Sequence, residues 1–335
     1  MFKIFDEKIN GILFVIIFPF LLFLMSYYGF ESSYVRMKDM EKAPDFMFSS
    51  VYAYRVIPNF LSVYVTYGVT YIVDHILPFT KGFLLKNGTL FYHSTFLINV
   101  FFFIGTSIIL NTIFKLKTAQ FLLNINVRRV VHLLAVFFMV IVQYVPTNCD
   151  SIALFFYVWG ILLTLKYFHN RSSKYLIGLS VIIFISTFVR ETACLNIAFF
   201  GALFIDFKEL TKGKLIYWKE VGFLVISFIV PYIVLRLIIR QDTSFFEGVY
   251  LVKNFTSPYN LAGLLFGVIG LYLTYKLCDE NGRMILKKYL FFSSPYLLMI
   301  TLVGLFWEAR LFMPLILAGF VVASHQFKNI IPSNS

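Results

Sequence analysis

The stretch GILFVIIFPFLLFLM, residues 11–25, contains no charged side chain, and the uncharged run continues to Phe30. An apolar segment of about 17–25 residues crosses the ~30 Å hydrocarbon layer of a bilayer as one α-helix. The preceding MFKIFDEKIN is a basic start, but no small-residue cleavage site follows the apolar run. We therefore expect a retained first transmembrane helix over 9–29 and not a cleaved signal peptide.

The whole chain has the composition of a membrane protein. Of its 335 residues, 59% are hydrophobic and 14% are charged, whereas a soluble domain is about half apolar and a quarter charged. The alternating segments of about ten residues that a transmembrane β-barrel needs do not occur in the sequence. We predict one all-α, polytopic, membrane-embedded domain over 1–335. Its ten expected transmembrane helices are 9–29, 93–114, 129–146, 151–168, 174–189, 193–206, 221–238, 259–276, 290–306 and 311–327.

The basic excess predicts the orientation of this domain. The chain has 29 Lys and Arg against 17 Asp and Glu, a net charge of +12. In a soluble protein this excess would suggest a nucleic-acid partner, but in a polytopic protein Lys and Arg concentrate in short cytoplasmic loops. Most of them lie in or at the edges of 1–8, 115–128, 169–173, 207–220, 277–289 and the C-terminal tail. We expect no nucleic-acid partner, cytoplasmic N- and C-termini, and a large extracytoplasmic loop over 30–92. The Phe, Ile, Asn and Lys bias indicates a bacterial cytoplasmic (inner) membrane.

The segment 56–78, VIPNFLSVYVTYGVTYIVDHILP, has two placements. As an eleventh span it would reverse the orientation of everything before or after it and move a lysine-rich segment outside. As an amphipathic or re-entrant helix it would pack on the outer face of the bundle. Its many Tyr, Thr and Ser residues favour the second placement.

Charged side chains recur at the outer ends of several expected helices. In FVRETACL, Arg190 and Glu191 fall at the turn between two spans, and Glu308 and Arg310 occupy a similar turn in LFWEARLFMP. With the orientation given above, the charged residues at this membrane edge are Arg55, Asp150, Arg190, Glu191, Arg236, Arg240, Glu308 and Arg310.

Three interpretations fit these charges. Helix ends contact water, and long arginines extend towards it. The charges could also pair with one another as structural contacts, for example Glu308 with Arg190. In the third interpretation they form a functional site, because ionisable groups at membrane level commonly mark one. The arginines outnumber the acids, and a guanidinium suits phosphate oxygens, so such a site would hold an anionic lipid phosphate.

The outer loop supplies further polar and aromatic side chains. Its carboxylates could serve as a general base near a bound hydroxyl, or they could belong to an ordinary solvated loop. These acids are Glu31, Asp39, Glu41 and Asp45. Its aromatic residues could stack on a sugar ring or lie at the membrane interface; they are Tyr34, Phe48, Tyr52 and Tyr54.

Several kinds of site have no signature in the sequence. There is no glycine-rich phosphate loop, no paired-histidine zinc motif and no nucleophile elbow. The three cysteines, Cys149, Cys194 and Cys278, are far apart and form no disulfide or metal pattern. We expect neither a metal nor a cofactor.

Four segments of the chain resemble, in order, segments of the GT-C superfamily of integral-membrane glycosyltransferases. The first span is followed by a long outer loop with Asp39 and Asp45 that ends in YAYRVIPNF (52–60), similar to a "yRvLvP" pattern. The segment NCDSIALFFYVWGILLTL (148–165) is similar to a "D-plalll" helix start. FVRETACLNIAFF (188–200) is similar to "ltRETalll", and WEARLFMPLILA (307–318) is similar to a late "EtR-f-P" turn.

The resemblance implies a polyprenyl-phosphate-linked sugar as donor, a lipid or glycan acceptor, and contact with membrane lipids. Asp39 or Asp45 would be the catalytic base that activates the acceptor. The implied substrate-binding residues are Glu31, Arg55, Asp150, Arg190, Glu191, Arg236, Arg240, Glu308 and Arg310, with the arginines on the lipid phosphate. No Asp-Asp or Glu-Asp doublet follows the first span, which leaves the choice of base and any metal requirement open.

Two other functions stay open at this point. An O-antigen-type polysaccharide polymerase also uses lipid-linked substrates and outer arginines, but its large loop is expected late in the chain. A transporter or flippase of lipid-linked sugars would need a charged path to the inner face, whereas the membrane-level charges here lie on one side.

Overall fold

The computed structural model describes residues 9–29, 38–116, 118–119, 122, 124–143, 149–207, 209, 212–213, 216–239 and 249–327. Throughout these residues the regular secondary structure is helical. The longer helices are α2 (Phe18–Gly29), which continues the π-helical turn η1 (Leu13–Ile17), α4 (Val56–Tyr71), α6 (Leu90–Phe114), α7 (Ile125–Gln143), α8 (Asp150–Asn170), α9 (Ser173–Thr187), α12 (Trp218–Ile238) and α14 (Pro258–Leu277). The shorter helices are α5 (Lys81–Asn87), α10 (Cys194–Phe204), α13 (Leu251–Thr256), α15 (Glu280–Phe292), α16 (Ser294–Val303) and α17 (Met313–Ser324). Single helical turns are η2 (Asp45–Phe48), η3 (Ser50–Tyr54), η4 (Ile72–Ile76), η5 (Pro78–Thr80), η7 (Glu191–Ala193) and η9 (Ala309–Leu311).

The protein is an all-α, multi-pass membrane protein, as its sequence predicts. Seven helical segments are long and apolar enough to cross a membrane: Ile9–Gly29, Val56–Ile76, Leu90–Phe114, Ile125–Gln143, Asp150–Asn170, Trp218–Ile238 and Pro258–Leu277. Six of them coincide with expected spans. The other four expected spans correspond to shorter apolar helices: Ser173–Thr187, Glu191–Phe204, Ser294–Val303 and Met313–Ser324. Seven of the helical segments are therefore candidate spans by length and composition, and the four shorter helices have 10–17 residues because turns interrupt the apolar blocks there.

The bundle is built around α8, which has buried side chains on almost every turn. Helices α6, α9 and α10 pack against it. The contact with α10 is close at Gly160, where a Cβ would lie 2.2 Å from the Asn196 side-chain oxygen. Because no side chain fits between the two helices at this level, Gly160 fixes their separation.

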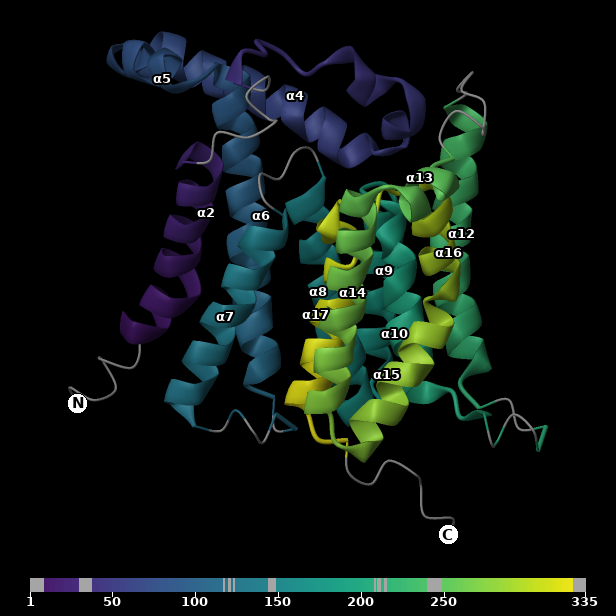
Figure 1. The fold of residues 1–335 in the computed structure, drawn as a ribbon. Coiled ribbons are helices and arrows are strands. Elements are labelled where there is room, and N and C mark those ends of the chain that lie inside the picture. Colours follow the sequence, from purple (N-terminus) through teal and green to yellow (C-terminus); the bar gives the residue numbers. More distant parts are fainter. Residues whose placement is uncertain are drawn as a thin grey trace.

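The segment 56–78 lies across one end of the bundle, which we call the α4 end. Figure 1 shows α4 running over the ends of the other helices, not alongside them, with α5 continuing outward beside the start of α6. The Ile57 amide donates a hydrogen bond to the Phe188 carbonyl at the end of α9 (3.2 Å). Length and composition alone would also allow Val56–Ile76 to span a membrane. Its position in the fold favours the predicted helix on the face of the bundle.

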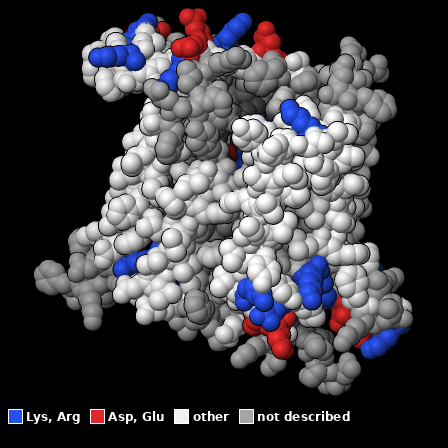
Figure 2. Space-filling model, viewed as in Figure 1, with Lys and Arg blue, Asp and Glu red and all other residues white. Residues whose placement is uncertain are grey.

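Charged side chains gather at the two ends of the molecule. Figure 2 shows blue and red atoms at the α4 end and at the opposite end, with a largely uncharged band between them. A hollow below α4 exposes a small area of charged atoms inside the α4 end. The uncharged band matches the surface that lipid tails would cover, and the charges in the hollow lead to the site described next.

Candidate functional site

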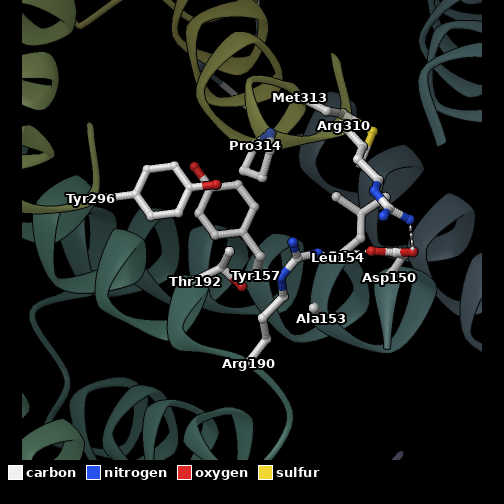
Figure 3. A pocket seen from close by; sticks show the side chains of 10 residues that line it. All are labelled: Asp150, Ala153, Leu154, Tyr157, Arg190, Thr192, Tyr296, Arg310, Met313 and Pro314. Carbon is white, nitrogen blue, oxygen red and sulfur yellow. Dashed lines mark hydrogen bonds and ion pairs between the residues drawn. The ribbon is translucent and has the colours of Figure 1, made fainter. Parts of the chain in front are cut away.

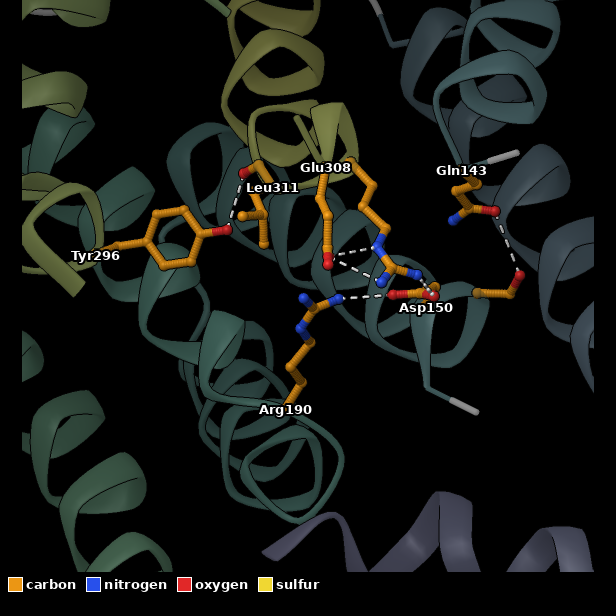
Figure 4. Close-up of polar contacts among 8 residues, drawn as sticks. Gln143, Asp150, Arg190, Tyr296, Glu308 and Leu311 are labelled. Atoms are coloured by element: carbon orange, nitrogen blue, oxygen red, sulfur yellow. Dashed lines mark hydrogen bonds and ion pairs between the residues drawn. The ribbon is translucent and has the colours of Figure 1, made fainter. Parts of the chain in front are cut away.

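The carboxylate of Asp150 is the centre of a charged cluster at the α4 end. Its side chain is 5% exposed and receives Nη1 of Arg190 on one oxygen (2.7 Å) and Nη1 of Arg310 on the other (2.8 Å). Arg310 also donates through Nε and Nη2 to Oε2 of Glu308, at 3.1 and 2.8 Å. We call Asp150, Arg190, Glu308 and Arg310 the charged cluster; Figure 4 labels Asp150, Arg190 and Glu308, which meet from three separate segments of the chain. The cluster contains two arginines and two acids, so its formal charges cancel.

Local structure places each member of the charged cluster. Asp150 is the first residue of α8, where its negative charge also suits the positive end of the helix dipole. Arg190 is extended between α9 and η7. Burial by itself lowers the pKa of Arg190, but the neighbouring Cys149 and Asp150 raise it by more. The guanidinium therefore stays charged beside Asp150.

Two buried asparagines hold the turn that carries Glu308 and Arg310. Asn254 donates its amide to the carbonyls of Thr301 (3.1 Å) and Gly304 (2.8 Å) and accepts from the Phe306 amide (3.2 Å). Asn260 accepts from the Trp307 amide at 2.9 Å. These bonds satisfy backbone groups that a turn leaves without helical partners. Asn254 begins the sequon Asn-Phe-Thr, but its side chain is 0% exposed and used in these bonds, so it is closed to glycosylation as folded.

Glycine 263 on α14 lets this turn approach. A Cβ at Gly263 would lie 1.9 Å from the Phe306 carbonyl oxygen. The backbone of the turn therefore lies directly on α14, and the separation of α14 from the turn helps to set where Arg310 reaches α8.

A small cavity of about 20 Å³ lies beside the charged cluster. Figure 3 shows Asp150, Arg190 and Arg310 on one side of it, with the rings of Tyr157 and Tyr296 on the other. The Tyr296 hydroxyl donates to the Leu311 carbonyl (2.8 Å). A volume of this size holds a single water molecule, so a larger ligand would have to lie outside the cavity or displace the charged cluster.

Arg236 forms a second, looser site at the same end. Its Nη2 is 3.9 Å from Oε1 of Glu191, and its guanidinium lies over the rings of Tyr232 (3.6 Å) and Tyr54 (4.6 Å). The side chain of Arg236 is 35% exposed. Stacking on aromatic faces stabilises a cation without using its hydrogen-bond donors, so Arg236 keeps donors for a ligand.

Arg55 and Tyr54 belong to residues 45–55, the segment of η2 and η3 that precedes α4, which we call the cap. Its guanidinium is over the ring of Tyr52 at 4.6 Å, and its Nε is buried without a hydrogen-bond partner. Buried donors without partners are uncommon in proteins. Arg55 and Arg236 thus differ from Arg190 and Arg310, whose guanidinium groups are both bonded to Asp150.

The structure brings together most, but not all, of the residues expected from the sequence. Asp39 and Asp45 are exposed and make no described contact with the charged cluster. Asp39 is beside the start of α6, where Thr89 bonds to the carbonyls of Lys38 and Met40. Asp45 opens η2, next to α4. Glu31 and Arg240 lie outside the described residues. Within the described ranges, no group of three or more His, Cys, Asp or Glu side chains could hold a metal ion.

The charges of the set pair with one another, as one of the three interpretations of the sequence held. Glu308 binds Arg310, two residues away, and Arg190 binds Asp150, so the pairs differ from the example of Glu308 with Arg190. Tyr157, Tyr296, Asn254 and Asn260 were not expected at the site. An uncharged polar residue inside an apolar helix is a weak signal, because tyrosine and asparagine also occur at membrane interfaces.

A scan against protein-family models and searches of curated proteins and of solved structures found no match to this chain.

Proposed function

We propose that the protein is a membrane glycosyltransferase of the GT-C type. It would transfer a sugar from a polyprenyl-phosphate donor to a lipid or glycan acceptor at the α4 end. One observation supports this most. Arginines from separate segments meet there, and two of them, Arg55 and Arg236, are stacked on tyrosines and not bound tightly to carboxylates. Such guanidinium groups suit phosphate oxygens.

The arginines at the α4 end fall into two groups, according to whether carboxylates neutralise them. Arg190 and Arg310 are neutralised by Asp150 and Glu308, so they brace the fold of the site. Among the described residues, Arg236 has one ion-pair contact, at 3.9 Å to Glu191, and it would hold the donor phosphate together with Arg55. This assignment narrows the sequence-based expectation, in which every arginine at this end binds the phosphate.

Asp45 is the preferred base. The cap that carries it is fixed to α4 by Asn59, whose amide donates to the carbonyls of Met47 and Tyr52. Asp45 therefore sits on the same cap as Arg55, whereas Asp39 lies by α6. The Asp45 carboxylate would take the proton of an acceptor hydroxyl. That oxygen would bond to the anomeric carbon of the sugar as the bond from this carbon to the phosphate oxygen breaks. The polyprenyl phosphate would leave as an anion held by arginine.

The direct test uses purified protein in lipid nanodiscs with a panel of radiolabelled polyprenyl-phosphate sugars. We expect transfer with one donor, and Arg236→Gln should raise its KM roughly 10- to 100-fold, because a hydrogen bond to a charged group is lost. Lys253→Gln is the matched control, since Lys253 is another cation over a tyrosine at this end, 5.8 Å from the Tyr250 ring. Asp45→Asn should abolish transfer while leaving donor binding intact. Absence of transfer with every donor would reject the enzyme, and saturable donor binding without transfer would favour a carrier of lipid-linked sugars.

A further inference from the structure

The α4–α5 segment, residues 56–87, carries an exposed row of aromatic side chains; we call this segment the ledge. Phe60, Tyr64, Tyr67 and Tyr71 follow one another at spacings of four and three along α4, which places them on one face of the helix. All four are at least half exposed, with Tyr67 at 67%. Phe79 and Phe83 continue the row onto η5 and α5, and Phe79 is 80% exposed.

This row is not what holds the ledge on the protein. A different face of α4, with Ile57, Leu61 and Val65, packs on a buried cluster that includes Ile152 and Val189. The ledge is thus already anchored. At the start of the row the Phe60 ring meets the Phe48 ring of η2, with the ring centroids 6.2 Å apart, whereas Tyr64, Tyr67 and Tyr71 remain more than half exposed. Contiguous exposed apolar surface of this kind marks an interaction site.

Two features identify lipid as the partner. First, the ledge is continuous with the lipid-facing surface of the bundle. The Leu84 carbonyl of α5 accepts from Nε2 of His93 on α6 (2.9 Å), and further along α6 Leu97 and Phe101 are exposed. Second, tyrosine is the residue type enriched where hydrocarbon meets headgroups, because its ring is apolar and its hydroxyl is polar.

The charge of the ledge favours anionic headgroups. The acidic residue of the ledge is Asp74, whose Oδ1 lies 2.7 Å from Nζ of Lys81. Lys86 adds a further positive charge. An interfacial helix with aromatic residues on one side and lysines nearby binds anionic lipid surfaces by both effects.

We propose that the ledge lies in the headgroup layer of the membrane and binds anionic phospholipid through its aromatic row and its lysines. This proposal does not depend on the glycosyltransferase function. With the ledge in the headgroup layer, the α4 end lies at the depth of the headgroups, and the charged cluster lies just beneath the lipid-bound ledge.

The test places a single tryptophan on the ledge. Trp159, Trp218 and Trp307 are replaced by Phe, and Tyr67→Trp or Phe83→Trp is introduced. The protein is then reconstituted with lipids brominated near the headgroup or near the chain terminus. We expect strong quenching by the shallow label and weaker quenching by the deep one. Phe101→Trp on α6 serves as the lipid-exposed control, and Glu41→Trp on the outer loop as the water-exposed control.

The lysines are tested in the same vesicles. With brominated phosphatidylglycerol in place of phosphatidylcholine, we expect stronger quenching at Tyr67→Trp. Lys81→Gln combined with Lys86→Gln should reduce that preference roughly fivefold, while quenching at Phe101→Trp shows that the variant stays folded. Quenching at the ledge no stronger than at Glu41→Trp would overturn the proposal and point to a soluble partner or a glycan chain on the aromatic row. Stronger quenching by the deep label would also overturn it, because α4 would then cross the bilayer.

Discussion

At the scale of single residues, the carboxylate of Asp150 is the group on which the charged cluster depends. Its buried carboxylate has two guanidinium partners from different turns. A buried charge is costly unless it is paired and hydrogen-bonded, and removing one partner leaves the others uncompensated. Asp150 therefore holds together three segments that are far apart in the sequence.

Asp150→Asn should lower the free energy of unfolding by about 3 kcal/mol, near the low end for a broken buried ion pair, because Arg310 keeps Glu308. The change can be measured by reversible unfolding in mixed micelles. The matched control is Asp74→Asn, which breaks an ion pair with the same 2.7 Å distance but with side chains 34% and 49% exposed. Exposed pairs contribute below about 1 kcal/mol, so equal losses in the two variants would contradict a structural role for Asp150.

At the scale of elements, α14 and the turn at 304–308 determine where Arg310 lies. Within the turn the Glu308 amide donates to the Leu305 carbonyl (2.9 Å), and further backbone groups of the turn are bonded by Asn254 and Asn260. Its approach to α14 depends on the missing side chain at Gly263. The position of the charged cluster is thus set partly by helices that contribute no charge to it.

Gly263→Ala should destabilise the protein by about 2 kcal/mol, the usual cost of overpacking, because the Phe306 backbone must move. Gly68→Ala is the control on another helix, since a Cβ there meets nothing within 4 Å, and it should be neutral or stabilising by up to about 1 kcal/mol. Both changes can be followed by thermal unfolding in detergent. A neutral Gly263→Ala would show that the turn adapts to the added methyl group without cost.

The sequence predicts elements well where apolar runs are long and poorly where turns interrupt them. The first span and the long helices α6 to α8 and α12 follow from hydropathy. The sequence left two placements for α4, and its position over the ends of the other helices favours the one that its Tyr, Thr and Ser residues suggest. The break between α15 and α16 does not, because Ser293 lies between two apolar runs that read as one. In the site, the charges of the cluster stand out against apolar neighbours. Which charge binds which depends on packing between helices, and that information is not local.

At the scale of the whole molecule, the described charged side chains on the face that Figure 2 shows gather at the two ends. The orientation predicted from lysine and arginine puts the α4 end on the extracytoplasmic side. A donor carried by a polyprenyl lipid would then meet the site from the outer leaflet, while the opposite end, with Lys276, Arg283 and Lys287, would face the cytoplasm.

Cysteines introduced at the two ends test this orientation. Glu41→Cys at the α4 end should react with a membrane-impermeant maleimide in intact cells. Glu280→Cys at the opposite end should react only after the membrane is opened. The native Cys149 and Cys278 are buried, and replacing Cys194 with alanine removes the remaining background. The reverse labelling pattern would place the charged cluster on the cytoplasmic side and reject transfer on the outer face.

The hydrogen bond between the Ile57 amide and the Phe188 carbonyl joins the start of α4 to the end of α9 through main-chain atoms only. Every amino acid except proline supplies that amide, and every amino acid supplies that carbonyl. The hydrogen bond itself would thus survive almost any exchange of side chains, although the Ile57 side chain also packs on the buried cluster that anchors α4. Alanine at Phe188 would leave the bond in place, Ile57→Ala would keep the amide but lose packing on the buried cluster, and Ile57→Pro would remove the amide itself.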